Sequence, residues 1–405
     1  MATTLLWICC GLLVYVYVLY PLVLAALAKR FGVPVVRGPS LPKVTIVVTA
    51  YNEQECIRAK LDNLTSLDYP RELVNILVAS DGSSDATEAI AATYDPPRVS
   101  VLRVEGRCGK TACQNAAAAA ASGEILLFTD ATTRLHPGAL KALVGNFSDA
   151  SVGCVGGRLI YVTDVDNVTG CGGEAYWSYE LRLRAAESLL GSLIGVSGCL
   201  YAVRKCAYRA IDPELISDFV IAMRMQEQHL RTVLAPDAIC FEETLDRGSH
   251  ELAMRVRVAI RSLNALVRER RFLNPLKYGC FAWQLWSHKV LRYASPLLWL
   301  GALAANVVLA YQTPYLVLLA AQCAIIAAGA VGFLLQGKRR DLGMLGRPYY
   351  LLLTNAASLI ATLRYLRGER MVTWKPIRYR ALLGPKSESF RKFQNSRKLR
   401  GHGSV

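Results

Sequence analysis

The stretch that most constrains the fold is Ile125–Asp130, a short apolar run that stops abruptly at an acid. A run of this kind is typical of a buried parallel strand that delivers one carboxylate to the carboxyl edge of a sheet. In open α/β sheets the ligand binds beyond that edge. Ile76–Asp81 and Ile211–Asp218 have the same form, so they predict two further acids delivered by strands. Helix caps and turns are the alternative for each acid, but three in one half of the chain favour a binding site.

The segment around these acids alternates predicted strands with predicted helices. Strands are expected at 44–49, 74–79, 99–104 and 124–129, and helices at 53–66, 84–93, 110–121 and 137–147. This alternation predicts an α/β fold with a mostly parallel sheet and helices on both faces. A linker that contains Gly, Ser and Pro, residues 38–42, precedes the first strand.

Long apolar runs flank this segment in a chain of 405 residues that is 53% hydrophobic. Leu5–Ala28 is uncharged and about as long as a bilayer is thick, which predicts a transmembrane helix within residues 1–30. Lys29 and Arg30 follow it, so the positive-inside rule places the next domain in the cytosol. A cleaved signal peptide is the alternative. Pro296–Ala310 and Tyr315–Leu335 are further candidates for membrane helices.

Two other stretches are expected at the membrane surface. Residues 251–295 are rich in Arg and aromatic residues, which predicts amphipathic helices in the interface, with ordinary buried helices as the alternative. Tyr349–Leu366 closes the predicted membrane region, 296–366, but a full crossing there would place the basic tail, 367–405, outside. We therefore predict a helix that does not cross independently and a cytosolic tail, with a third ordinary span as the alternative.

The charge and the cysteines limit the partners. The net charge is +16, and a basic surface could meet nucleic acid, anionic lipid or a phosphorylated substrate. The apolar runs favour the lipid bilayer, and nucleic acid is not expected because no groove-reading motif is present. The twelve cysteines include no CxxC pair, and the spacing of Cys108 and Cys113 does not fit a zinc knuckle. Reduced cysteines in a cytosolic or membrane setting are therefore expected.

Six short motifs occur in one order along the chain. They are Thr49-Ala50-Tyr51-Asn52-Glu53, Asp81-Gly82-Ser83-Ser84-Asp85, Arg107-Cys108-Gly109-Lys110 with Asn115, Phe128-Thr129-Asp130-Ala131-Thr132, Ser197-Gly198-Cys199-Leu200-Tyr201-Ala202 and Ser217-Asp218-Phe219. In this order they resemble family 2 glycosyltransferases, most closely the membrane-embedded branch with cellulose synthase, hyaluronan synthase and chitin-oligosaccharide synthases. The resemblance covers roughly residues 43–380.

The resemblance implies a GT-A (Rossmann-like) glycosyltransferase domain on the cytosolic side, over residues 40–250. It also implies transfer from a nucleotide sugar, with a UDP-sugar expected, by direct displacement with inversion. The acceptor would be a glycan or a lipid-linked molecule, and the product an exopolysaccharide or a membrane-associated glycan. Whether an export partner takes part is left open.

The resemblance also assigns roles to four residues. Asp81 would hold the uridine or ribose, and Lys110, at a helix start, would contact a phosphate or the base. Asp130 would ligate Mg²⁺ or Mn²⁺, which prefer oxygen ligands. Asp218 would take the acceptor's proton as general base. A turn or cap residue is the alternative for Asp81 and Asp218, and a solvated lysine for Lys110. The other substrate-binding candidates carried over from the motifs are Thr49, Tyr51, Glu53, Asn115, Gly198 and Tyr201.

The sequence departs from the family at three places. Thr132 stands where a second metal-binding acid is usual, and Ser217 where an acid usually precedes the base. The QxxRW motif of processive enzymes aligns with Met254–Val258, in which the arginine, Arg257, is kept, with Arg261 one turn later, but the tryptophan is missing. That tryptophan is a platform on which an acceptor sugar stacks.

Near the end, Val372–Lys375 resembles the gating loop that closes over the nucleotide in these synthases, which makes Trp374 a substrate-binding candidate. The gating-like segment favours a polymerase, whereas the missing tryptophan favours an enzyme that adds a single sugar to a lipid carrier. A scaffold that has lost metal binding and catalysis is the third alternative. Asp81, Asp130 and Asp218, which are all present, argue against the scaffold.

Overall fold

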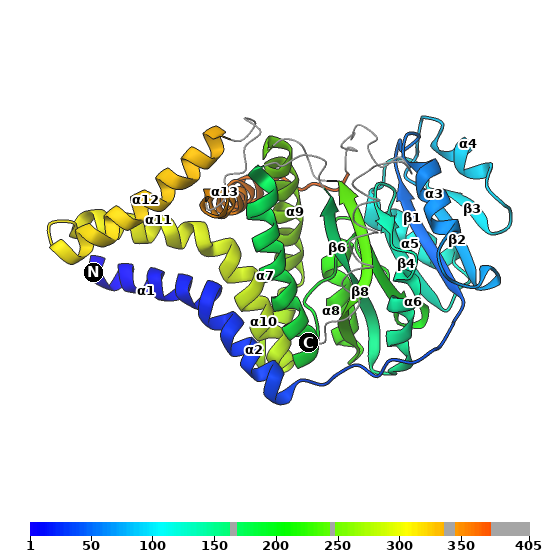
Figure 1. Ribbon diagram of the computed structural model, residues 1–405, viewed down its shortest axis with the longest axis horizontal. Helices are drawn as coiled ribbons and strands as arrows, with labels where there is room; N and C mark the ends of the chain where they lie inside the picture. Colours follow the sequence, from blue (N-terminus) through cyan, green and yellow to red (C-terminus); the bar gives the residue numbers. More distant parts are fainter. Residues whose placement is uncertain (163–167, 244–247, 336–344, 374–405) are drawn as a thin grey trace, which may run out of the picture.

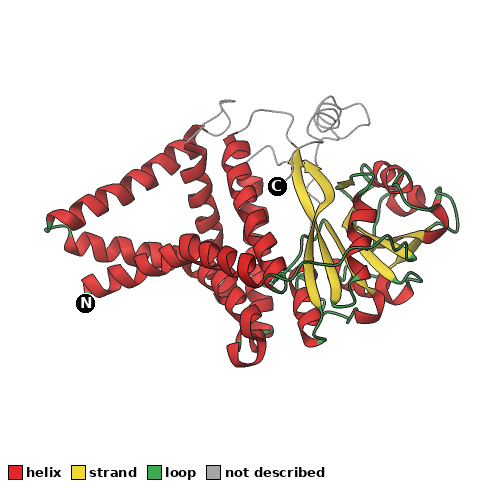
Figure 2. Cartoon of the chain, turned by 60° about the horizontal axis from the view of Figure 1, so that its bottom comes forward, coloured by secondary structure: helices red, strands yellow, loops and turns green. Residues whose placement is uncertain are grey.

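The computed structural model describes residues 1–162, 168–243, 248–335 and 345–373. Figure 1 shows two parts, a mixed α/β part on the right and a set of long helices on the left. Figure 2 shows that the strands are confined to the first part. Trp374 and most of the basic tail lie outside the described residues.

An eight-stranded sheet forms the centre of the α/β part, in the order β3-β2-β1-β4-β7-β6-β8-β5. Its strands are β1 (Val44–Ala50), β2 (Val74–Ser80), β3 (Val99–Arg103), β4 (Ile125–Asp130), β5 (Arg134–Leu135), β6 (Val152–Val162), β7 (Leu200–Arg204) and β8 (Arg231–Glu243). The first four strands along the chain, β1 to β4, lie next to one another and are parallel, as predicted. The remaining half is mixed, because β7 is antiparallel to both β4 and β6.

The direction of β7 matters for the site. Leu200, its first residue, pairs with Thr129, next to the last residue of β4. The loop before β7 therefore lies at the carboxyl edge of the sheet, and the strand has to run back from that edge. This places the loop residue Gly198 beside the acid that ends β4.

Helices cover both faces of the sheet, as predicted. Side chains of α3 (Ile57–Thr65), α4 (Thr87–Ala92) and α6 (Ala139–Val144) share one core cluster, and those of α5 (Lys110–Ala120), α8 (Ser217–Glu227), α9 (Gly248–Arg268) and α10 (Pro275–Leu285) share the other. The central strand β1 contributes side chains to both clusters, because Ile46 and Val48 point to one face of the sheet and Val47 to the other. Burial on both faces explains why the parallel strands are almost continuously apolar.

The strand predicted at Ile211–Ile216 is wrong. These residues form a turn, and Asp218 is instead the second residue of helix α8. Two causes are evident. Pro213 has no N–H for a ladder hydrogen bond, and β7 already occupies the edge of β4 that a further strand would need. The acid still reaches the sheet edge, but from the first turn of a helix.

Among the described residues, the helical part contains three segments long and apolar enough to cross a membrane, Ala2–Phe31, Pro275–Leu309 and Thr313–Leu335. The first comprises α1 (Ala2–Val14), the π-helical turn η1 (Tyr15–Leu19) and α2 (Tyr20–Phe31), and the last is α12 (Thr313–Leu335). The middle segment joins α10, the π-helical turn η6 (Trp286–Val290) and α11 (Leu291–Leu309). The helix therefore continues through the boundary predicted at residues 295 and 296.

Helix α13 (Gly346–Leu366) is not among the candidate spans found in the described residues. It packs against α9, where Ala357 and Ala361 meet Val256 and Ile260, and it lies beside α7 (Val168–Leu190) in Figure 1. This packing is in keeping with the prediction that this helix does not cross the membrane independently. That prediction still awaits a topology experiment.

Candidate active site

One cavity of about 700 Å³ joins the two parts of the molecule. At one end it is lined by residues at the carboxyl edges of β1 and β4, among them Thr49, Glu53, Asp130 and Thr132. From there it continues between α7, α9, η6, α11 and α13. Polar residues thus line a path from the sheet edge into the helical part.

Lys110 and Asp130 meet at the sheet edge. β4 ends at Asp130, and α5 begins at Lys110 directly after Gly109, whose φ of 91° is in the left-handed region that favours glycine. The Lys110 ammonium forms an ion pair with the Asp130 carboxylate and donates to the carbonyl oxygen of Gly198 at 3.3 Å. Burial opposes the charge on Lys110, but the negative charges of Asp130 and Asp218 outweigh it, so the pKa of the lysine is raised.

Asp218 completes this group, and Gly198 lies at its centre. A Cβ at residue 198 would lie 2.6 Å from Oδ2 of Asp218 and 3.2 Å from Nζ of Lys110. Only glycine therefore fits between the two charged groups without a shift. Burial raises the pKa of Asp218, and Lys110 and Arg261 oppose the rise only in part. A carboxylate with a raised pKa is a better proton acceptor, which suits a general base.

Glu242 also lines this end of the cavity, and sequence reasoning missed it. Its carboxylate accepts a weak hydrogen bond from Sγ of Cys199 at 3.6 Å. Burial, followed by the negative charge of Asp130, raises the pKa of Glu242 to about 7. The sequence does contain a pattern that could have identified Glu242, because the apolar run Ile239–Phe241 stops at this acid in the same way as β4 stops at Asp130.

These carboxylates suit a hard divalent cation, which takes oxygen ligands. The described residues contain no group of three or more His, Cys, Asp or Glu side chains arranged to hold a metal ion. The Asp130 carboxylate already has a cation beside it, the Lys110 ammonium. The residues therefore fit a cation bound by Asp130, with Glu242 close by, whose other ligands come from substrate and water.

The arginines predicted from the processive motif, Arg257 and Arg261, both line the cavity, one helical turn apart on α9. Nη2 of Arg261 donates to the carbonyl oxygen of Leu215 at 3.1 Å. Burial lowers the pKa of Arg261, and the neighbouring Asp218 opposes this effect. Positive charge therefore approaches Asp218 from the helix as well as from Lys110.

Asp81 has a different position from the one expected of a ligand-binding acid. It is completely buried and lies outside the cavity lining, and Oδ1 accepts from the backbone N–H groups of Cys108 and Gly109 at 2.8 and 3.0 Å. In this structure it fixes the loop that precedes Lys110. Its predicted role with the nucleoside remains a prediction.

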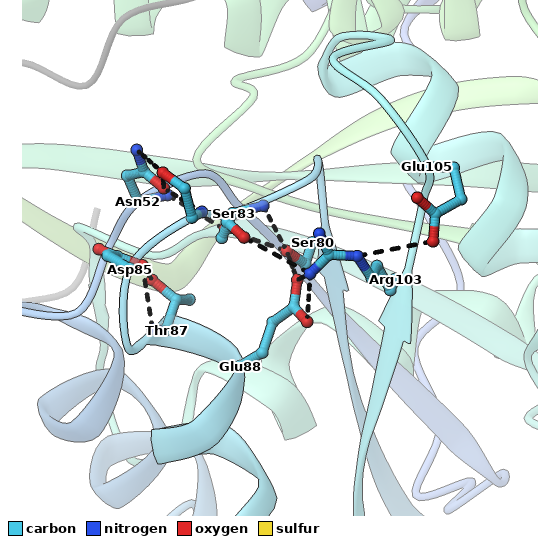
Figure 3. Close-up of polar contacts among 9 residues, drawn as sticks. Asn52, Ser80, Ser83, Asp85, Thr87, Glu88, Arg103 and Glu105 are labelled. Atoms are coloured by element: carbon cyan, nitrogen blue, oxygen red, sulfur yellow. Dashed lines mark hydrogen bonds and ion pairs between the residues drawn. The ribbon is translucent and has the colours of Figure 1, made fainter.

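Figure 3 shows how the turn after Asp81 is braced. Oδ1 of Asn52 accepts from the backbone N–H of Ser84 at 2.8 Å, and Oγ of Ser83 accepts from the backbone N–H of Asn52 at 3.1 Å. On the other side Arg103 and Glu88 form an ion pair at 2.8 Å. The network ties together the loops after β1 and β2 and the end of β3, so this edge of the sheet is held rigidly.

A buried lysine supports the loop of Asp130. Lys60 is 1% exposed, and its ammonium donates to Oγ1 of Thr129 and to the carbonyl oxygen of Thr133, both at 2.8 Å. Burial lowers the pKa of Lys60 to about 7. Sequence reasoning did not single out this residue, because one lysine in an amphipathic helix carries no signal that it is buried.

Besides Asp81, three described residues that were predicted to bind substrate lie outside the cavity lining. Asn115 bonds both backbone groups of Ile211, at 2.7 and 3.1 Å, and Tyr201 is 1% exposed and stacks on Phe128. The Tyr51 ring lies 3.7 Å from the Arg107 guanidinium. Their contacts indicate supporting roles, and direct substrate contact remains a prediction for each.

The last described segment before Trp374 lies beside the active site. A Cβ at residue 109 would lie 2.9 Å from the carbonyl oxygen of Val372, so this segment rests on the loop that precedes Lys110. Met371 packs against the cluster formed by α9 and α13. The described chain thus stops on the same side of the molecule as the cavity.

Comparisons with known proteins agree with this geometry. Residues 45–211 match the family described as Glycosyl transferase family 2, and this match supports a glycosyltransferase. Glycosyltransferase AglE of Haloferax volcanii is 32% identical over 122 residues, which are 30% of this chain and 40% of AglE. N-acetylglucosaminyltransferase of Rhizobium meliloti is 28% identical over 216 residues, 49% of this chain and 50% of that protein.

Beta-monoglucosyldiacylglycerol synthase of Trichormus variabilis is 29% identical over 172 residues, 42% of this chain and 37% of that protein. The chain therefore spans half or less of the length of these relatives. Among solved structures, mannosyltransferase PcManGT from Pyrobaculum calidifontis, in complex with GDP-Man and Mn²⁺, is similar over 90% of this chain and 100% of its own. The TM-score is 0.71 at 23% identity, which confirms the predicted GT-A glycosyltransferase fold.

Proposed function

We propose that the protein is a membrane-bound, metal-dependent glycosyltransferase that transfers one sugar from a nucleotide sugar to a lipid-linked acceptor with inversion. The observation that carries this proposal is the meeting of Lys110, Asp130 and Asp218 around Gly198. They lie in a cavity that continues into the helical part.

Asp130 would hold Mg²⁺ or Mn²⁺ together with oxygens of the donor's diphosphate, with Glu242 close by. When bound, the metal supplies positive charge that stabilises the leaving diphosphate. Mn²⁺ in the structure of PcManGT supports this choice. Lys110 would then be released from Asp130 to contact a phosphate oxygen as a point charge.

Asp218 would act on the acceptor. It takes the proton of the acceptor hydroxyl, whose oxygen forms the new bond to the anomeric carbon. The bond between that carbon and the donor's phosphate oxygen breaks, and the nucleoside diphosphate leaves with the electron pair. Attack from the opposite side inverts the configuration. Arg257 and Arg261 add positive charge on this side of the cavity.

Two observations support a lipid-linked acceptor. The cavity extends between helices that adjoin the candidate membrane spans, and Val258 stands where processive relatives carry the stacking tryptophan. A relative named beta-monoglucosyldiacylglycerol synthase agrees with this preference. Exopolysaccharide synthesis is the second candidate, because Val372 brings the gating-like segment to the loop before Lys110. Trp374 would then close over the nucleotide.

We also propose that the catalytic domain and the tail lie in the cytosol. Lys29 and Arg30 follow the first candidate span, and the positive-inside rule assigns this end to the cytosol. Since Val372 lies beside the active site, the tail begins on the same side as the catalytic domain.

A donor panel tests the proposed function. The purified full-length protein is incubated with Mn²⁺, a membrane lipid extract and UDP- or GDP-linked sugars, and the nucleoside diphosphate released and the size of the products are measured. We expect one donor to give a lipid product enlarged by a single sugar. A ladder of long products would favour the second candidate, and no release from any donor would contradict both.

A further inference from the structure

We propose that the helical end of the cavity is a phosphate-binding subsite for the acceptor, with Lys289 as its principal cation. The inference rests on the proposed function, because it concerns the acceptor of that reaction. It names a chemical group that the acceptor carries in addition to its reacting hydroxyl.

Lys289 lies at the junction of the two ends of the cavity. It belongs to the π-helical turn η6, is half-buried and lines the cavity. Its ammonium lies 5.1 Å from the centre of the Phe219 ring, and Phe219 directly follows Asp218. Within the described parts of the chain, Lys289 has neither a hydrogen bond nor an ion pair. A cation that lies near the base but forms no ion pair with a described carboxylate is suited to bind an anion on the substrate.

Two more cations face the same space. Arg292, three residues after Lys289, donates from Nη1 to Glu180 at 2.8 Å, whereas its buried Nη2 has no partner among the described residues. Arg184 on α7 donates to the carbonyl oxygen of Gly195 at 2.9 Å, in the loop that leads to Gly198. Both arginines line the cavity. Together with Lys289 they offer several N–H donors to one anionic group.

A buried network holds these cations in place. His288 bridges two carboxylates of α7, with Nδ1 2.7 Å from Glu187 and Nε2 2.9 Å from Glu180. The hydroxyl of Tyr20 on α2 donates to Glu187 at 2.8 Å. The network therefore joins the first and second candidate spans through α7, and Arg292 is fixed because it shares Glu180. Such rigid support is what a binding site requires.

The helices themselves are distorted at this point. The π-helical turns η1 and η6 face each other, and the hydroxyls of Tyr15 and Ser287 lie 2.8 Å apart between them. π-helical turns are rare and occur frequently at functional sites. Two that meet beside Lys289 favour a binding role over simple packing.

The charge balance selects an anion. Arg184, Lys289 and Arg292 carry three positive charges, whereas Glu180 and Glu187 carry two negative charges when both are ionised. With His288 counted as neutral, these groups have one positive charge in excess, and a protonated His288 would add a second. Ionisable groups in or next to a membrane span are costly and commonly mark a substrate path. A phosphate offers both the charge and several acceptor oxygens. It could belong to a lipid headgroup or to a soluble sugar phosphate.

The test is direct binding to the full-length protein in neutral detergent. The probes are a 20-carbon isoprenyl phosphate, the matching isoprenol, which lacks only the phosphate, and glucose 1-phosphate. The proteins are wild type, Lys289→Gln, Lys289→Arg and Lys277→Gln. Lys277 is a matched control, because it also lies over an aromatic ring, that of Tyr278 at 5.4 Å, but does not line the cavity.

We expect wild type and Lys277→Gln to bind the isoprenyl phosphate at least about tenfold more tightly than the isoprenol. Lys289→Gln should reduce this preference to about twofold or less, and Lys289→Arg should largely restore it. Binding of glucose 1-phosphate that also depends on Lys289 would support the subsite and identify a soluble phosphate as the source. An unchanged preference in Lys289→Gln, or no preference in wild type, would overturn the inference.

Release of nucleoside diphosphate is measured on the same preparations, so that the two proposals can fail separately. If donor turnover is absent while phosphate binding depends on Lys289, the proposed function is wrong and the subsite stands. If donor turnover is normal and phosphate binding is unchanged in Lys289→Gln, the proposed subsite is wrong and the proposed function stands.

Discussion

The two ends of the cavity are built from different secondary structure, and they hold their charges differently. At the sheet end, Asp130 and Glu242 come from the last residues of strands, and Lys110 from the first residue of a helix. At the helical end, Glu180, Glu187 and Arg292 project from helix faces. Strand ends converge at one edge through backbone pairing, whereas helix faces meet only through tertiary packing.

This difference suggests a division of tasks. The groups at the sheet end surround one small space, where a single lysine contacts Asp130 and lies close to Asp218, as an attack on one carbon atom requires. At the helical end the two carboxylates of Glu180 and Glu187 are already paired with His288. Such an arrangement can position a substrate without reacting with it. Substitutions at the sheet end should therefore affect turnover, and those at the helical end the affinity for the acceptor.

The largest effect is expected for Asp218→Asn. Loss of a general base should reduce the transfer rate by about 10² to 10⁴. Donor binding should stay within a few-fold, because Asp218 acts on the acceptor. The measurements are the rate of product formation and the Kd of the nucleoside diphosphate. Asp212→Asn is a matched control, because Asp212 lies outside the cavity lining, where its carboxylate pairs with Arg268 and accepts from the backbone N–H of Glu214. Near wild-type transfer by Asp218→Asn would remove this residue from the mechanism.

The second largest loss of transfer rate is expected for Asp130→Asn. Loss of the proposed metal-binding carboxylate should lower the transfer rate by about 10² or more, since a bound cation contributes several kcal/mol to the leaving-group charge. The rate should also fall to background in excess chelator and recover on addition of Mn²⁺. Thr132→Asp, which restores the usual second acid, should keep or raise the affinity for Mn²⁺. Full activity in chelator would exclude the metal role of Asp130.

Glu242→Gln is expected to have a smaller effect, on the affinity for Mn²⁺, and it tests whether a second strand-end acid takes part at the sheet end. If Glu242 assists a cation at Asp130, its removal should weaken Mn²⁺ binding by about 10- to 100-fold, as for groups that support metal ligands. Free Mn²⁺ can be followed by its electron paramagnetic resonance signal in the presence of nucleoside diphosphate. An unchanged Mn²⁺ affinity would restrict Glu242 to a structural role.

The smallest effect concerns stability and pH. The pKa of Lys60 in the folded protein is about 7, below its ordinary value of 10.5. Between these pH values the unfolded chain binds more protons, so the free energy of unfolding due to Lys60 rises with pH. From pH 7 to pH 10 the melting temperature of wild type should therefore rise relative to that of Lys60→Met by at least about 2 °C. Parallel curves for the two proteins would show that Lys60 titrates normally.

The sheet end could largely be predicted from the sequence. The apolar run before Asp130 fixes a strand and its end, so the parallel strands and the position of this acid followed from pattern alone. Asp218 was placed on the wrong element, because the segment Ile211–Ile216 has apolar residues at both ends, but Asp212, Pro213 and Glu214 interrupt it and form a turn instead of a strand. Glu242 was missed although its strand ends in the same way.

The helical end could not be predicted in this manner. From the sequence, Lys289 and Arg292 were expected on an amphipathic helix at the membrane surface. They lie in a cavity only because α7, from another part of the chain, packs against the candidate spans. The burial of Lys60 depends likewise on the loop of Thr129 and Thr133. Partners distant in sequence leave no local pattern.

A structure of the full-length protein with Mn²⁺ and its nucleotide-sugar donor tests the central claim most directly. Anomalous scattering locates Mn²⁺, and the account predicts it beside Asp130, with the diphosphate next to it. Lys110 should have moved from Asp130 to a phosphate oxygen, and Asp218 should face the anomeric carbon. Mn²⁺ or donor bound elsewhere, or an intact ion pair between Lys110 and Asp130 in the donor complex, would contradict the account.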